Sequence, residues 1–144
     1  MIKKEIIDQK RDNKFYQVAE TAIKETEEAL GFPIPNELKD FYLHIGCGFL
    51  DGSKYNVNRI MGPYSVRDFR LRQNDFEFYP DIDLYDNYED NKLIFFETNE
   101  SALLSIEMGT QEKSKIYYYD TIIADSLEEF ILKIQEDDKY YYNL

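Results

Sequence analysis

The chain contains one histidine and one cysteine, and they lie three residues apart, at His44 and Cys47. An imidazole beside a thiol can activate a cysteine nucleophile when a third group orients the imidazole. The surrounding sequence indicates neither an orienting acid nor an oxyanion donor. A single free cysteine is more often a small buried hydrophobic residue. We therefore predict no catalytic role for this pair and no enzyme activity.

Acidic residues are dense between positions 75 and 90, with aromatic residues between them. Their spacing lacks the DxDxDG pattern and the twelfth-position glutamate of a calcium loop, so we predict no metal site. One interpretation, the commoner for such a run, is a solvated loop anchored to the core by its aromatic rings. The other is a partner-binding surface whose carboxylates imitate a phosphate backbone in the basic groove of a nuclease. Its candidate residues are Asp75, Glu77, Tyr79, Asp81, Asp83, Tyr85, Asp86, Tyr88, Glu89 and Asp90.

Four of the chain's five arginines come shortly before the acidic segment. They form a candidate secondary charged patch, which could meet an acidic partner. Repulsion among like charges and the nearby carboxylates favour internal pairing instead. The four residues are Arg59, Arg67, Arg70 and Arg72.

The composition narrows the function further. A net charge of −12 argues against direct nucleic-acid binding, which needs clustered lysine and arginine side chains. One cysteine excludes an intramolecular disulfide and a cysteine-rich zinc site. No secretory signal is evident, and no apolar run approaches the roughly 18 residues of a spanning helix, so we expect a cytoplasmic protein that contacts no membrane. We expect no cofactor, and the sequence leaves the oligomeric state open.

Two helices are predicted in the first third of the chain, which we assign as residues 1–46. Apolar residues recur at helical spacing up to Leu30, and Gly31 follows at the position where a left-handed residue ends a helix. Pro35 suits the start of the next helix, and Gly46 with Gly48 stops it. The buried stripe of this second helix comprises Leu38, Phe41, Tyr42 and Ile45.

The remainder is predicted as a loop and strand region over 47–121 and a helix over 125–137. Segments 93–98, 102–108 and 115–121 are aromatic, β-branched or alternating, and short polar turns separate them, as in an antiparallel meander. Ser126 and Glu129 fit a capping box at the start of the last helix. We expect one α+β domain over 1–144, with helices packed on one face of a curved, mainly antiparallel sheet.

Three stretches resemble the SUKH superfamily, which contains fungal cell-wall synthesis regulators of the Smi/Knr type and many bacterial immunity proteins. They are the two-helix unit from 25 to 51, the strand-rich middle (LIFFETNESALLSIEM and KIYYYD) and the start of the last helix (IADSLEEF). Together they cover about residues 20 to 135. The family's usual asparagine-glycine pair after the second helix and its tryptophan before the last strands are absent.

The resemblance implies a non-enzymatic protein without a cofactor, whose family motif residues are architectural. Bacterial relatives act by binding a cognate secreted polymorphic toxin, often a nuclease, so a toxin protein is the expected partner. The fungal relatives imply the alternative of a regulatory or scaffolding module that binds an endogenous protein. On either account the contact is expected on the charged surface between residues 59 and 90.

Overall fold

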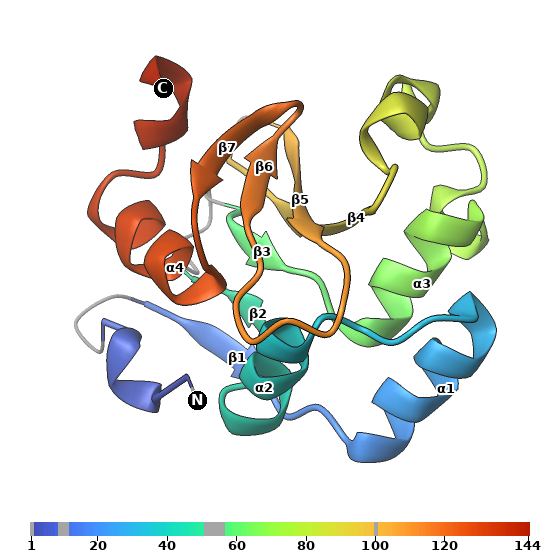
Figure 1. The fold of residues 1–144 in the computed structure, drawn as a ribbon, viewed down its shortest axis with the longest axis horizontal. Helices are drawn as coiled ribbons and strands as arrows, with labels where there is room; N and C mark the ends of the chain where they lie inside the picture. The colour runs from blue at the N-terminus through green and yellow to red at the C-terminus, as the bar shows by residue number, and fades with distance from the viewer. Residues whose placement is uncertain (1, 9–11, 51–56, 100) are drawn as a thin grey trace.

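The computed structural model describes residues 2–8, 12–50, 57–99 and 101–144 (Figure 1). Short 3-10 helices are labelled η. In chain order the elements are η1 (Lys4–Ile6), β1 (Lys14–Tyr16), α1 (Glu20–Leu30), α2 (Asn36–His44), β2 (Cys47–Phe49), β3 (Arg59–Ile60), α3 (Pro63–Leu71), η2 (Asn74–Phe76), η3 (Ile82–Tyr88), β4 (Lys92–Glu97), β5 (Leu103–Glu107), β6 (Ile116–Tyr118), β7 (Thr121–Ala124), α4 (Leu127–Glu136) and η4 (Tyr140–Asn143).

The strands of the described residues form one seven-stranded sheet, in which each strand pairs antiparallel with the next along the chain. β1 and β7 are consequently its two edges. In Figure 1 the sheet crosses the middle of the molecule, with α4 on the left and α1 and α3 on the right. The predicted α+β class and antiparallel meander are confirmed.

The two-helix unit is confirmed, but its start is later than expected. α1 begins only at Glu20, and residues 14–16 form β1 instead of helix. Gly31 ends α1 with a left-handed φ of 81°, and its N–H donates to the carbonyl of Glu27 at 2.9 Å. The predicted stripe of α2 is buried, apart from Ile45, which lies half-buried beyond the helix end.

Gly48 was expected to stop α2, but it lies inside β2 and has a positive φ of 141°. A Cβ at this position would lie 2.1 Å from the carbonyl oxygen of Lys14 in the neighbouring strand β1. The glycine is therefore needed because two backbones approach closely, which no local pattern reveals.

The centre of the sheet is covered on both faces, since all four central residues of β4 are buried, Leu93 to Phe96. The pairing of β4 with β5 shifts between Ile94 and Phe96. This bulge interrupts the alternation of side chains. Phe95 and Phe96 both pack edge-to-face on Phe130 of α4, at 6.0 and 5.0 Å between ring centroids.

The stretch from 63 to 90, which falls in the predicted loop and strand region, is largely helical. α3 starts at Pro63 and buries Val66 and Phe69 against the neighbouring elements α1 and β4. A Gly-Pro pair is typical of a turn, but proline also suits the first helical position, and the second reading applies here. η2 and η3 then carry most of the acidic segment.

The predicted strand 115–121 is interrupted. Tyr119 adopts a left-handed φ of 54° and, with Asp120, makes the turn between β6 and β7. At the start of α4, Ser126 Oγ accepts the N–H of Glu129 at 3.0 Å, as a capping box requires. In return, the Glu129 carboxylate accepts the N–H of Asp125, the residue before Ser126, at 2.8 Å. None of the described helices is long and apolar enough to cross a membrane.

Candidate protein-binding surface

The acidic segment is held to the body of the protein by a cluster of aromatic rings. Phe69 of α3 packs edge-to-face on Phe76 at 5.1 Å and on Tyr85 at 5.9 Å, and Phe76 contacts Tyr79 at 5.4 Å. The Tyr85 hydroxyl accepts the backbone N–H of Leu103 in β5 at 3.1 Å. The expectation that aromatic residues anchor this segment is therefore confirmed.

Two arginines at the end of α3, Arg70 in its last turn and Arg72 just after it, bind the far end of the segment. Arg72 donates to Asp86 at 2.8 Å and also pairs with Glu89. Arg70 donates to the backbone carbonyls of Glu89 and Lys92, both at 2.9 Å. The predicted internal pairing is confirmed for these two arginines. Their contacts fix the C-terminal end of η3, and the residues that follow it, against the end of α3.

The other two arginines pair elsewhere, so the four do not make one continuous patch. Arg59 in β3 pairs with Glu97 in the adjacent strand β4, and its Nε lies 2.9 Å from that carboxylate. Arg67 pairs with its neighbour Asp68 at 2.9 Å, and its guanidinium lies 4.8 Å from the ring centre of Tyr64.

The structure divides the ten candidate residues into two groups. Tyr85 and Glu89 are buried, and Tyr79 and Tyr88 are half-buried, so these four mainly hold the segment in place. The six others are exposed, namely Asp75, Glu77, Asp81, Asp83, Asp86 and Asp90.

Two exposed apolar residues lie between these carboxylates in the sequence, and neither was among the ten candidates. Phe78 is 87% exposed and Leu84 is 61% exposed. Large apolar side chains are usually assigned to the core, so their sequence offered no signal of exposure. We define the acidic face as the six exposed carboxylates together with Phe78 and Leu84.

The acidic face carries charge that the rest of the protein leaves uncompensated. Asp86 pairs with Arg72. The other five carboxylates form no ion pair with any base in the described part of the chain. A surface of this kind attracts a basic partner and offers apolar area for contact once the partner has arrived.

The buried carboxyl of Glu89 gives a pH prediction. Burial raises its pKa above the ordinary glutamate value, although the hydrogen bond from Arg72 opposes this. By contrast, the hydrogen bond from Lys133 lowers the pKa of the Glu129 carboxyl. A raised folded pKa means that Glu89 contributes its stability below the unfolded pKa and loses it as the pH rises through the folded value.

In an NMR titration of the side-chain carboxyls, Glu89 is therefore expected to titrate at a higher pH than Glu129. The variant Arg72→Met should raise the Glu89 midpoint further and leave that of Glu129 unchanged. A Glu89 midpoint at or below that of Glu129 would contradict the burial argument.

The only histidine and cysteine lie on different elements, His44 at the end of α2 and Cys47 at the start of β2. The structure supplies the orienting acid that the sequence did not indicate, because Asp40 Oδ1 lies 2.8 Å from His44 Nδ1. Among the described residues, however, no hydrogen bond joins His44 to Cys47, which lies in β2. Burial raises the pKa of the Cys47 thiol, whereas a cysteine nucleophile requires a lowered one.

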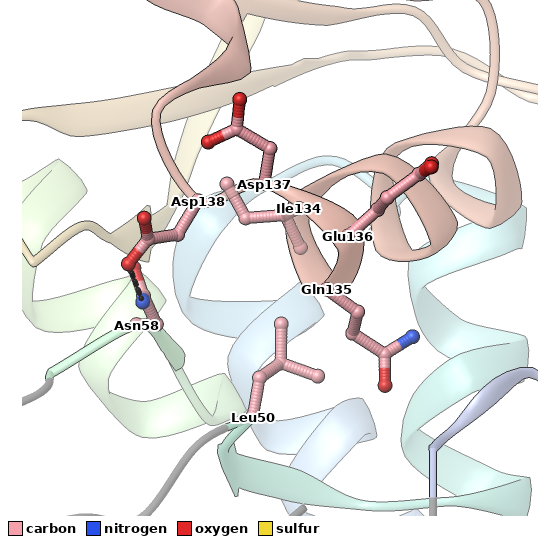
Figure 2. A pocket seen from close by; sticks show the side chains of 7 residues that line it. All are labelled: Leu50, Asn58, Ile134, Gln135, Glu136, Asp137 and Asp138. Carbon is pink, nitrogen blue, oxygen red and sulfur yellow. Dashed lines mark hydrogen bonds between the residues drawn. The ribbon is translucent and has the colours of Figure 1, made fainter.

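A hollow of about 230 Å³ lies between the end of α4 and β3 (Figure 2). Leu50 and Ile134 face each other across it, and Asn58 donates to Asp138 at 3.3 Å. Gln135 is already occupied, since it accepts the N–H of Asp8 and donates to the carbonyls of Ile6 and Ile131. The polar groups of Gln135 thus serve the protein's own contacts. Within the described ranges, no group of three or more His, Cys, Asp or Glu side chains is placed to hold a metal ion.

Comparisons with known proteins agree with the resemblance. The model of the SUKH_6 family, described as SMI1-KNR4 cell-wall, matches residues 20–131. A Bacillus subtilis (strain 168) protein named immunity protein YxxD is 58% identical over 134 residues, which span 93% of this chain and 91% of the relative. No solved structure matches. The chain therefore belongs to the SUKH superfamily, in its SMI1-KNR4 cell-wall group.

Proposed function

We propose that this protein is an immunity protein that binds a cognate secreted toxin and neutralises it. The observation that carries the proposal is the 58% identity, over nearly the full length of both chains, to a protein named as an immunity protein. Inhibition is stoichiometric and non-enzymatic on this proposal: the protein covers a functional surface of the toxin and remains bound.

The acidic face is the proposed contact surface. Its uncompensated carboxylates would speed the encounter with a basic toxin surface and set the orientation of the complex. Phe78 and Leu84 are large, exposed and close together in sequence, so each would bury apolar area in the complex. The ion pairs of Arg72 keep η3 in place, which lowers the conformational entropy lost on binding.

For the kind of toxin, we propose a nuclease. Carboxylates separated by apolar side chains could occupy a groove that normally holds a phosphate backbone, which is lined with Lys and Arg. A nucleic-acid oligonucleotide should then compete with this protein for a catalytically inactive form of the toxin. A complex that is unaffected by excess oligonucleotide at low salt would contradict the nuclease proposal but leave the immunity proposal standing.

The decisive experiment is co-expression with the toxin encoded beside the gene. Cells that produce the toxin should survive only when this protein is also produced, and the two proteins should copurify. Equal killing with and without the protein would refute the proposal. The family description also favours a second candidate, a regulatory module that binds an endogenous protein. Copurification with a housekeeping protein, and no protection from any neighbouring toxin, would support that second function.

A further inference from the structure

A second group of aromatic side chains lies at the end of the β6–β7 hairpin. Tyr118 contacts Tyr141 at 4.9 Å and Tyr142 at 6.1 Å, so the hairpin packs against the C-terminal helix η4. Tyr141 and Tyr142 contact each other at 4.9 Å. The carboxyl end of the chain is thereby held on the sheet by ring contacts, and none of these residues belongs to the acidic segment.

The same hairpin also contacts the acidic segment. The ring centre of Tyr119 lies 6.0 Å from that of Tyr85 and 5.1 Å from that of Tyr88, both in η3. It lies 4.8 Å from the ring centre of Tyr118. Figure 1 shows the turn of the hairpin between η3 and the C-terminus, at the top of the molecule. The rings therefore make a continuous connection from η3 across the hairpin to η4.

This connection continues onto exposed apolar side chains. Tyr142 is 45% exposed, and Leu144, two residues further along the chain, is 63% exposed. Together with the half-buried rings of Tyr88, Tyr118 and Tyr119, they form what we call the tyrosine face. An exposed apolar surface that adjoins a proposed interface is typical of a continuation of that interface.

One tyrosine ring next to this face already receives a cation. Lys133 Nζ lies 5.7 Å from the ring centre of Tyr140 in η4, the residue before Tyr141. Tyrosine rings attract ammonium and guanidinium groups through their negative faces, and tyrosine is enriched where such contacts dominate binding. Asp90, which forms no ion pair with a described base, is two residues from Tyr88, so a cationic partner is favoured over a neutral one.

We propose that the tyrosine face is the second half of the binding surface, and that it receives Lys or Arg side chains of the bound protein. This inference rests on the proposed function for the identity of the partner, the toxin. It adds that the contact extends from η3 over the β6–β7 hairpin to the last residues of the chain. The carboxylates attract and orient the basic side chains, and the rings supply their contact area.

The first test uses the full chain and a catalytically inactive form of the neighbouring toxin. Calorimetry on the double variant Tyr142→Ala with Leu144→Ala should show a dissociation constant raised at least tenfold. The matched control is Tyr16→Ala in β1, since Tyr16 is 59% exposed and lies on the opposite edge strand of the sheet. The control should bind like the wild type. Circular dichroism establishes that both variants fold. Wild-type affinity of the double variant would overturn the proposal.

The second test does not depend on the toxin. Deca-arginine peptide added to the isotope-labelled protein should shift the NMR signals of residues 118–122 and 140–144 together with those of η3. Shifts spread evenly over the molecule, or centred on β1, would overturn the proposal. If the wild type fails to bind the toxin, the proposed function falls, and the peptide experiment alone decides whether this surface takes cationic side chains.

Discussion

Replacement of Glu37 by alanine is expected to lower the free energy of unfolding by about 3 kcal/mol, because several buried N–H groups lose their acceptor. Glu37 is only 6% exposed, and it lies in the first turn of α2. Its carboxylate accepts the backbone N–H groups of Ser114 at 3.0 Å, Leu127 at 2.8 Å and Glu128 at 3.0 Å. One side chain thus joins α2 to the β5–β6 connection and to the start of α4.

The physical reason is the incomplete bonding at a helix start. The first N–H groups of α4 have no partner within their own helix, and the Ser126 hydroxyl accepts the N–H of Glu129 alone. The carboxylate of Glu37 satisfies two of the others, and its negative charge also interacts favourably with the helix dipole. Glu37→Gln keeps one acceptor oxygen, so we expect about half of the loss seen with alanine.

Urea denaturation followed by circular dichroism measures both variants. The control is Glu112→Ala, because Glu112 is an exposed acid close by in the β5–β6 connection. The control should change stability by less than about 0.5 kcal/mol. If Glu37→Ala were no less stable than Glu112→Ala, the carboxylate would not hold the three elements together.

Reversal of two charges on the acidic face is expected to slow association with the toxin at least tenfold at low salt. In the double variant Asp81→Lys with Asp83→Lys, two exposed carboxylates without ion pairs become repulsive to a basic partner. Electrostatic steering acts mainly on the association rate, and salt screens it. The difference from wild type should therefore shrink at high ionic strength. Stopped-flow measurements at two salt concentrations give both rates.

The control for this experiment carries the same change in net charge. Glu5→Lys with Glu112→Lys alters two exposed acids that lie outside the proposed surface and form no ion pair with a described base. If only the total charge mattered, both double variants would slow association equally, and the acidic face would not be the interface. A specific interface requires that the variant at Asp81 and Asp83 be slowed far more than the control.

Much of the fold could be predicted because its signals are local. The end of α1 at Gly31 and the cap of α4 at Ser126 depend on residues within one helical turn, and both are confirmed. β1, β2 and β3 were missed because they contain only two or three residues each. Strands so short carry no periodic pattern, and only their pairing with neighbours defines them.

The sequence indicated a candidate binding segment, but it could not show which residues of that segment are buried and which are exposed. The density of carboxylates between 75 and 90 indicated where a partner could bind, a prediction that the experiments above can test. Burial of Glu89 and exposure of Phe78 reverse the usual preferences of their residue types. Glu89 is buried beside Arg72 at the end of α3, whereas Phe78 stays outside while its neighbours Phe76 and Tyr79 contact Phe69. Both outcomes depend on contacts between segments that are separated along the chain.

The sequence by itself determined the helical unit around Gly31, the meander, the acidic character and the superfamily, because each depends on neighbouring residues or on composition. Only the tertiary structure decided that Glu37 caps α4, since Glu37 and its hydrogen-bond donor Leu127 are 90 residues apart in the sequence. Only the tertiary structure, too, brought Tyr119 beside Tyr85 and so joined the C-terminus to the acidic segment. Such contacts form when the whole chain closes around one core, and no local pattern records them.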